Sequence, residues 1–274
     1  MLQQFGPVMS LFKRHALTIS GAGTRHLIFL HGVGCDQHVW HYISPRFERT
    51  HRVVLLDLIG SGNSDHAAFE PERYKTLQGQ ADDLIAICRS LGGGPVDVVG
   101  HSLGGMAALL AASQAPELFS RLLLLNVSPC HRNLGNYEGG FSDDDIEGLL
   151  ASLRASLRDW SAHVAPLAIA DDGQTVIIDE LEGYFCSNNS TILEHQVHCA
   201  LMADLRDDLS KVTVPCVLFH CRNDAFVSQD ARNCLMEALP NVASADILTS
   251  GHFPNLTDPE VVTAAIRFQL SKVI

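Results

Sequence analysis

Short apolar runs alternate with segments of helical periodicity along most of this 274-residue chain, and this alternation is the strongest constraint on its fold. Some runs are apolar on both faces, such as Leu122-Leu123-Leu124-Leu125, which is typical of central strands in a sheet covered on both sides. The pattern predicts an α/β protein with a mostly parallel, doubly wound sheet. Strands are expected at residues 15–20, 26–30, 52–57, 96–100, 121–126, 215–220 and 244–248, and helices at 74–91, 103–113 and 259–270.

Residues 130–208 break the alternation, because they carry helical patterns and almost no strand signal. Ser142 followed by three aspartates is a helix start, and apolar residues at steps of three and four then predict one amphipathic helix over residues 142–164. Two more helices are expected at 180–185 and 192–205. We therefore predict a core of residues 1–129 and 209–274 with a helical lid, 130–208, inserted between two strands. A dimerisation face or simple packing is the alternative.

Composition limits the partners of the chain. The 19 Lys and Arg against 31 Asp and Glu give a formal net charge of -12, which argues against nucleic acid or an anionic membrane. No apolar run approaches the ~18 residues of a membrane span, and the first residues lack the pattern of a secretory signal. The eight scattered cysteines favour buried thiols in a reducing compartment over a disulfide framework. We expect a soluble, cytoplasmic protein.

A candidate nucleophile lies in Gly100-His101-Ser102-Leu103-Gly104, which directly follows an apolar strand pattern and precedes an Ala- and Leu-rich helix pattern. A strand that turns sharply into a helix can present a serine at its apex when small residues flank the turn. The helix N-terminus then directs backbone N–H groups toward the serine oxygen. The alternative, a small-residue junction without chemistry, does not account for this context. Ser102 is therefore predicted to be the nucleophile.

The serine needs a base, and the base needs an acid to orient it. Among 14 histidines, His252 follows the last strand and precedes the last helix, so it is expected at the same sheet edge as Ser102. Asp224 follows the strand before it. An alternative acid position, after residues 121–126, holds Asn126, which cannot carry the charge. The order Ser102, Asp224, His252 agrees with a strand-turn-helix nucleophile architecture.

An anionic intermediate needs two hydrogen-bond donors. One is expected to be the backbone N–H of Leu103, directly after the nucleophile. The other is expected from the loop His31-Gly32-Val33-Gly34, at the N–H of Val33. This chemistry needs no cofactor and no metal.

Other candidates carry less weight. The glycine-containing segment 57–64 resembles a phosphate loop but lacks the P-loop lysine, so a structural turn is favoured. His195 and His198 are three apart on a helix pattern, but no further ligand pair accompanies them, which favours packing or exposure over a metal site. His101 and His31 are interpreted as residues that shape the elbow and the loop.

These motifs resemble the serine α/β-hydrolases over essentially the whole chain. Within them the chain is similar to a narrower group, formed by the bacterial stress-response regulator RsbQ and the plant karrikin and strigolactone receptors. Several segments without a catalytic role carry this resemblance: 31–37, 57–65, 73–77, 116–121, 128–130, 139–141, 185–187 and 208–215. The resemblance implies a four-helix lid over an apolar pocket, with Ser102, Asp224 and His252 as nucleophile, acid and base. It also implies a small hydrophobic ligand.

Two positions depart from that group. The phenylalanine usual in its His-Gly-Phe-Gly loop is Val33 here, which is expected to widen or reshape the pocket mouth. The elbow continues as Leu103-Gly104-Gly105, the form commoner among turnover esterases. Both departures bear against receptor-like signalling and leave hydrolysis untouched.

The leading hypothesis is a serine hydrolase that cleaves a small, mainly apolar ester or lactone, with lid residues such as Trp160, Phe185 and Leu201 turned toward its pocket. The alternative is a ligand-sensing regulator with slow hydrolysis that signals to a protein partner through its lid. The same Ser-His-Asp set also serves cofactor-free haloperoxidases, C–C hydrolases and hydroxynitrile lyases, and the sequence does not separate these chemistries.

Overall fold

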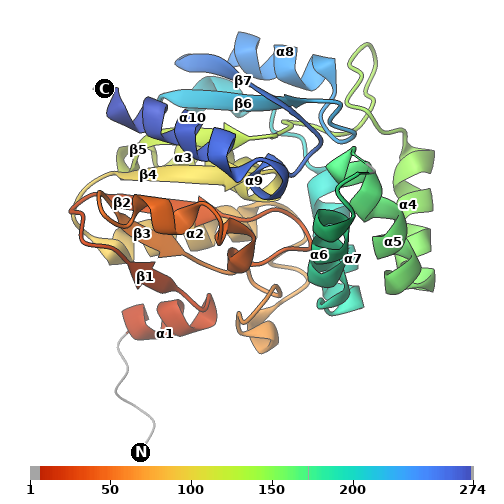
Figure 1. Ribbon diagram of the computed structural model, residues 1–274, viewed down its shortest axis with the longest axis horizontal. Coiled ribbons are helices and arrows are strands. Elements are labelled where there is room, and N and C mark those ends of the chain that lie inside the picture. The colour runs from red at the N-terminus through yellow and green to blue at the C-terminus, as the bar shows by residue number, and fades with distance from the viewer. Residues whose placement is uncertain (1–6, 172, 273–274) are drawn as a thin grey trace, which may run out of the picture.

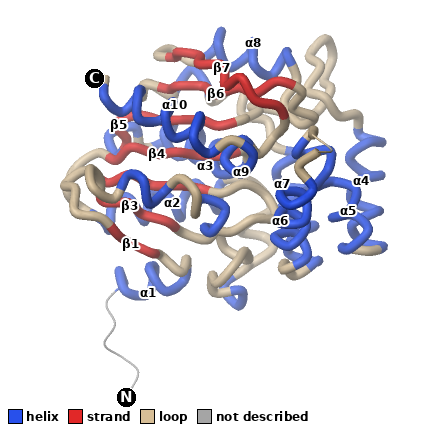
Figure 2. Tube along the Cα trace, in the orientation of Figure 1, coloured by secondary structure: helices blue, strands red, loops and turns tan. Residues whose placement is uncertain are grey.

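A single twisted sheet runs through the centre of the protein, as a computed structural model that describes residues 7–171 and 173–272 shows (Figures 1 and 2). In these residues seven strands follow the order β1-β3-β2-β4-β5-β6-β7, and all pairs are parallel except β1 with β3. The strands are β1 (Thr18–Ser20), β2 (His26–Leu30), β3 (Arg52–Leu55), β4 (Val96–His101), β5 (Phe119–Leu125), β6 (Cys216–Arg222) and β7 (Val242–Ser250). All seven expected strands are present, and the fold class is confirmed.

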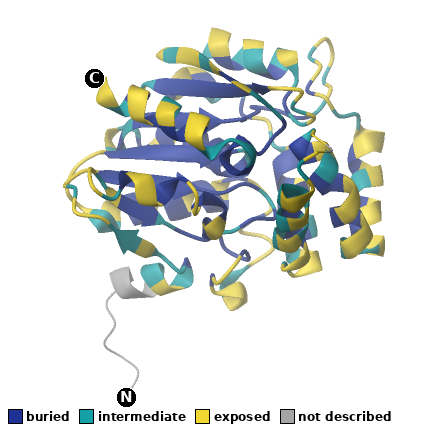
Figure 3. Ribbon diagram, viewed as in Figure 1, coloured by how far each residue is buried: buried dark blue, intermediate teal, exposed yellow. Residues whose placement is uncertain are grey.

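Helices cover both faces of the sheet, so two apolar cores form. One core contains the apolar sides of α2 (Gln78–Leu91), α3 (Leu103–Gln114) and α8 (Gln229–Ala238). The other lies under α9 (Pro254–Thr257) and α10 (Pro259–Ser271). The central strands β2 and β4 are buried along their whole length, as Figure 3 shows, which explains why most of their residues are apolar on both faces.

Four described helices connect β5 to β6 and lie beyond one end of the sheet (Figure 1). We call them the helical insert: α4 (Asp143–Ala155), α5 (Leu157–Ile169), α6 (Thr175–Cys186) and α7 (Ser190–Met202). α4 packs against α5 and α7, and α5 packs against α6. The expected start of the first helix is correct, because Ser142 and Asp145 form a capping box.

The single helix expected over residues 142–164 is wrong, because the chain breaks at Ser156. This residue is extended (φ -159°, ψ 109°), and its hydroxyl accepts a hydrogen bond from the Asp159 amide, so it caps a new helix. The serine-to-aspartate spacing of three was visible in the sequence. The apolar periodicity hid it, since both helices turn their apolar sides toward the same core.

Other differences concern the ends of elements. The expected strand at 15–20 begins only at Thr18, and the helix expected from residue 74 begins at Gln78. Helices α1 (Pro7–Arg14) and α8 were not expected. None of the described helices combines the length and apolar character needed to cross a lipid bilayer.

Candidate active site

Ser102 lies at the sharp turn between β4 and α3. Its backbone is in a region that L-residues rarely adopt (φ 49°, ψ -120°). The turn depends on its glycines, because a Cβ atom at Gly100 would lie 2.6 Å from the Gly105 Cα, and one at Gly104 would lie 2.6 Å from the His31 carbonyl oxygen. The Ser102 amide donates to the Leu125 carbonyl at 3.1 Å, which ties the turn to β5. The sequence of the turn therefore fixes where the hydroxyl lies.

His252 and Asp224 form a hydrogen-bonded pair at the same end of the sheet. The His252 Nδ1 lies 2.9 Å from both carboxylate oxygens of Asp224, and the Phe226 amide donates to Asp224 Oδ1 at 2.8 Å. Burial alone would raise the pKa of Asp224, but the contacts with His252 and with the Phe226 amide outweigh it and hold this pKa below its ordinary value. A carboxylate therefore accepts the Nδ1 proton, which leaves Nε2 as the basic nitrogen.

The backbone of His252 is held from three directions. Its carbonyl oxygen accepts hydrogen bonds from His101 Nε2 at 2.8 Å and from Asn126 Nδ2 at 3.1 Å. Its amide donates to the carbonyl of Ala168 in α5. Burial lowers the pKa of His101 to about 3, so this ring stays neutral and serves as a donor. Asn126, at the alternative acid position, thus positions the candidate base.

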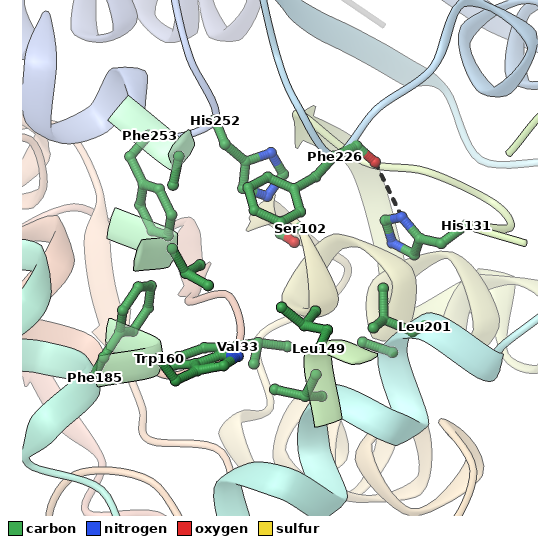
Figure 4. A pocket seen from close by; sticks show the side chains of 14 residues that line it. Val33, Ser102, His131, Leu149, Trp160, Phe185, Leu201, Phe226, His252 and Phe253 are labelled. Carbon is green, nitrogen blue, oxygen red and sulfur yellow. Dashed lines mark hydrogen bonds between the residues drawn. The ribbon is translucent and has the colours of Figure 1, made fainter. Parts of the chain in front are cut away.

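Ser102 and His252 line the same pocket, and Figure 4 shows the hydroxyl and the ring both facing it. Among the described residues neither side chain has a hydrogen bond to the other. Hydrogen bonds between a nucleophile and its base are often loose in the absence of substrate and tighten when substrate binds. The structure thus places all three predicted residues at one edge of the sheet. The contact between His252 and Asp224 is formed, and that between Ser102 and His252 is not.

The amides expected to bind an oxyanion are free to do so. Leu103 is the first residue of α3, and Val33 lines the pocket beside Ser102. Within residues 7–171 and 173–272, neither N–H donates a backbone hydrogen bond outside the regular elements. An unbonded N–H at a helix N-terminus suits a developing negative charge.

The pocket wall is mainly hydrocarbon. It encloses about 70 Å³, well below the ~300 Å³ at which pockets for drug-sized ligands begin. Trp160, Phe185 and Leu201, the lid residues considered from the sequence, are among those that line it. The full lining is Val33, Ser102, His131, Leu149, Trp160, Val164, Ala168, Phe185, Val197, Ala200, Leu201, Phe226, His252 and Phe253 (Figure 4).

Sequence reasoning named six of these residues as site candidates and missed the other eight, among them Phe253, Phe226 and His131. Phe253 and Phe226 could have been predicted to lie near the site, because they stand one and two positions after the candidate base and acid. His131 had no such signal, since it enters the pocket from the loop after β5.

The other candidate residues have structural partners. Asp57 is buried and accepts hydrogen bonds from the amides of Gln37 and Asn63 at 2.8 Å each, so the segment 57–64 is a structural turn. His31 shapes its loop by bonding the Gly32 carbonyl and the Leu58 amide. His195 Nε2 lies 3.1 Å from the Pro71 carbonyl oxygen. Across the described residues, no three His, Cys, Asp or Glu side chains gather as metal ligands would.

Comparison with known proteins agrees with this geometry. Residues 27–265 match the family described as "Alpha/beta hydrolase family". The chain belongs to this family. It is 33% identical over 270 residues to Strigolactone esterase RMS3 of Pisum sativum, covering 97% of this chain and 99% of the relative. It is 32% identical over 249 residues to Karrikin insensitive 2 receptor CA of Petunia hybrida, covering 90% of this chain and 92% of the relative.

Among solved structures, olei00960, a hydrolase from Oleispira antarctica, superposes with a TM-score of 0.92 at 29% identity, over 97% of this chain and 98% of that one. The chain is therefore an enzyme of the α/β-hydrolase superfamily that resembles carboxylic ester hydrolases. The expected resemblance to the karrikin- and strigolactone-receptor group is confirmed.

Proposed function

We propose that this α/β-hydrolase cleaves a small, mainly apolar ester or lactone by serine chemistry. The observation that carries the proposal is the elbow serine, Ser102, facing the same apolar pocket as His252, whose Nδ1 is bonded to Asp224. A pocket with hydrocarbon walls and these reactive groups suits a substrate whose single polar centre is the bond to be broken.

The geometry supports a two-step reaction. Ser102 Oγ attacks the carbonyl carbon while His252 Nε2 takes its proton, and the amides of Val33 and Leu103 bind the oxyanion. The same proton then goes to the leaving alkoxide, which departs as an alcohol. Water, deprotonated by His252, then attacks the acyl carbon, and His252 returns this proton to Ser102 Oγ as the bond to the serine breaks and the acid is released. Asp224 stabilises the imidazolium in both steps.

The helical insert is proposed to act as a lid, with residues 130–208 as its unit and the remainder as the core. Trp160, Phe185 and Leu201 come from three of its helices and form much of the pocket wall. The α5 carbonyl of Ala168 also accepts the His252 amide, so the insert is linked directly to the candidate base. The eight free cysteines and the acidic charge favour a reducing, cytoplasmic setting.

Replacing Ser102 by alanine tests the proposal. We expect kcat/KM on short nitrophenyl esters to fall by several powers of ten, because the acyl-enzyme can no longer form. Ser187→Ala, at an exposed serine, is the matched control and retains activity. A fluorophosphonate probe is expected to label Ser102 alone, as mapped by mass spectrometry. Wild-type activity in Ser102→Ala, or labelling elsewhere, would refute the proposal.

A second candidate function is a ligand-sensing regulator that hydrolyses its ligand slowly and signals to a protein partner through the insert. The favouring observation is the 32% identity to a protein named as a receptor, over 90% of this chain. It predicts a burst of one product per enzyme followed by slow turnover. Rapid multiple turnover of a short ester would contradict it.

A further inference from the structure

His131 is a polar residue in the pocket for which the proposed mechanism has no use. It lies in the loop after β5, is 5% exposed, and lines the pocket with Ser102 and His252. Its Nδ1 lies 3.0 Å from the Phe226 carbonyl oxygen, the contact drawn as a dashed line in Figure 4. This contact holds the ring in one orientation, and Figure 4 shows the other ring nitrogen on the side of the pocket.

The contact with Phe226 decides where the proton of the His131 ring is. A carbonyl oxygen only accepts hydrogen bonds, so Nδ1 must carry hydrogen. Burial, and then the charge of nearby His252, lower the pKa of His131 to about 4, so near pH 7 the ring is neutral and carries one proton. Nε2 is then a bare lone pair. Among the described residues, nothing donates a hydrogen bond to it.

The rest of the wall offers no equivalent group. Apart from Ser102, His252 and the indole nitrogen of Trp160, the lining side chains are hydrocarbon. The indole N–H is a donor only, and Ser102 and His252 are occupied by the reaction. His131 Nε2 is thus the side-chain acceptor left for a ligand. A ligand that has no hydrogen-bond donor near Nε2 would displace water from this nitrogen and leave the nitrogen unpaired, which costs free energy in an apolar site.

We propose that His131 is a specificity-determining residue whose Nε2 accepts a hydrogen bond from a hydroxyl group of the substrate. This inference rests on the proposed function and narrows it: the preferred substrates are hydroxylated esters or lactones, ahead of their deoxy analogues. The hydroxyl is a separate group from the carbonyl that is attacked, because the carbonyl oxygen is taken by the amides of Val33 and Leu103 in the proposed mechanism.

Nitrophenyl esters of butanoate, 2-hydroxybutanoate and 3-hydroxybutanoate test the inference. After division by each ester's rate of alkaline hydrolysis, we expect wild-type kcat/KM for at least one hydroxylated ester to exceed that for butanoate about tenfold. His131→Phe, similar in size and unable to accept, is expected to abolish this ratio, and His131→Gln, which retains an acceptor oxygen, to preserve part of it. His198→Gln, at an exposed histidine of α7, is the control and keeps the wild-type ratio.

The inference is overturned if no hydroxylated ester is favoured in the wild-type protein, or if the preference survives in His131→Phe. Failure of the proposed function looks different, because none of the three esters would then be turned over. In that case thermal-shift titration of the protein with γ-butyrolactone and its 2- and 3-hydroxy derivatives still decides: tighter binding of a hydroxylated lactone, lost in His131→Phe, supports the inference, and equal binding overturns it.

Discussion

A carboxylate is buried at each end of the sheet, and the two carboxylates differ in their partners. At the start of β4, Asp97 is completely paired: Arg121 Nε and Arg25 each donate to it at 2.9 Å, and Arg121 also binds the carbonyls of Gln269 and Lys272. Near the other end, Asp224 is paired with an imidazole whose second nitrogen faces a pocket.

The two ends differ in whether their polar groups have partners. At the amino end the Asp97 carboxylate is paired with two guanidinium groups, which are always charged, and this pairing stabilises the fold. At the carboxyl end a serine hydroxyl, two amides and two histidine nitrogens are left for something that the protein itself does not supply. These groups surround a pocket, and it is this combination of a pocket with reactive groups that indicates a functional site.

The largest expected effect comes from Asp224→Asn. The amide cannot hold His252 in the tautomer that leaves Nε2 basic, so kcat on a short nitrophenyl ester is expected to fall about 10⁴-fold. The urea midpoint is expected to change much less than it does in Asp97→Asn. Steady-state kinetics and urea unfolding measure the two effects. Wild-type activity in Asp224→Asn would contradict the prediction, because Asp224 would then have no more effect on catalysis than Asp97.

Asp97→Asn is the reciprocal change at the amino end. It leaves Arg121 buried without its countercharge, so the free energy of unfolding is expected to fall by about 3–5 kcal/mol. Because Asp97 lies at the opposite end of β4 from Ser102, kcat of the folded fraction is expected to stay within about twofold. Urea denaturation and active-site titration with a fluorophosphonate separate the two effects. A loss of kcat in fully folded Asp97→Asn would contradict the view that Asp97 contributes to stability alone.

Val33→Phe restores the residue usual in the resembling group at the pocket wall. The larger ring occupies space in a cavity of about 70 Å³, so kcat/KM is expected to drop about tenfold for a hexanoate ester and little for an acetate ester. A chain-length series of nitrophenyl esters measures this shift, with Val176→Phe at an exposed site of α6 as the control. Equal losses for both esters would mean that Val33 does not limit the pocket.

The smallest expected effect concerns His220, at the carboxyl end of β6. Neither ring nitrogen has a hydrogen-bond partner among the described residues, and burial, aided by Arg232, lowers its pKa to about 4. The pKa of His220 is thus about 4 in the folded chain and 6.5 in the unfolded chain. Between these pH values the unfolded chain binds a proton at His220 and the folded chain does not, so the free energy of unfolding falls as the pH falls.

His220→Leu removes this proton uptake and the unpaired nitrogens. The variant is expected to be about 1 kcal/mol more stable near pH 7 and to lose less stability on acidification. Urea unfolding of both proteins at pH 7 and pH 5 checks the sign. A steeper loss in the variant would show that His220 has an undetected partner.

The sequence by itself determined the sheet and the position of its chemistry. Strand runs that are apolar on both faces require burial, and the glycines around Ser102 permit the sharp turn in which its φ is 49°. The chain order of Ser102, Asp224 and His252 then places the three at one edge, because the ends of parallel strands share it.

Only the tertiary structure decided what surrounds them. The break at Ser156 depends on how two helices reach the same core, and the support of His252 by His101, Asn126 and Ala168 joins residues far apart in the chain. The role of His131 depends on one carbonyl, that of Phe226, which fixes the proton on Nδ1. Local periodicity records which residues are buried, whereas hydrogen-bond partners across the fold are set by packing, which no local pattern encodes.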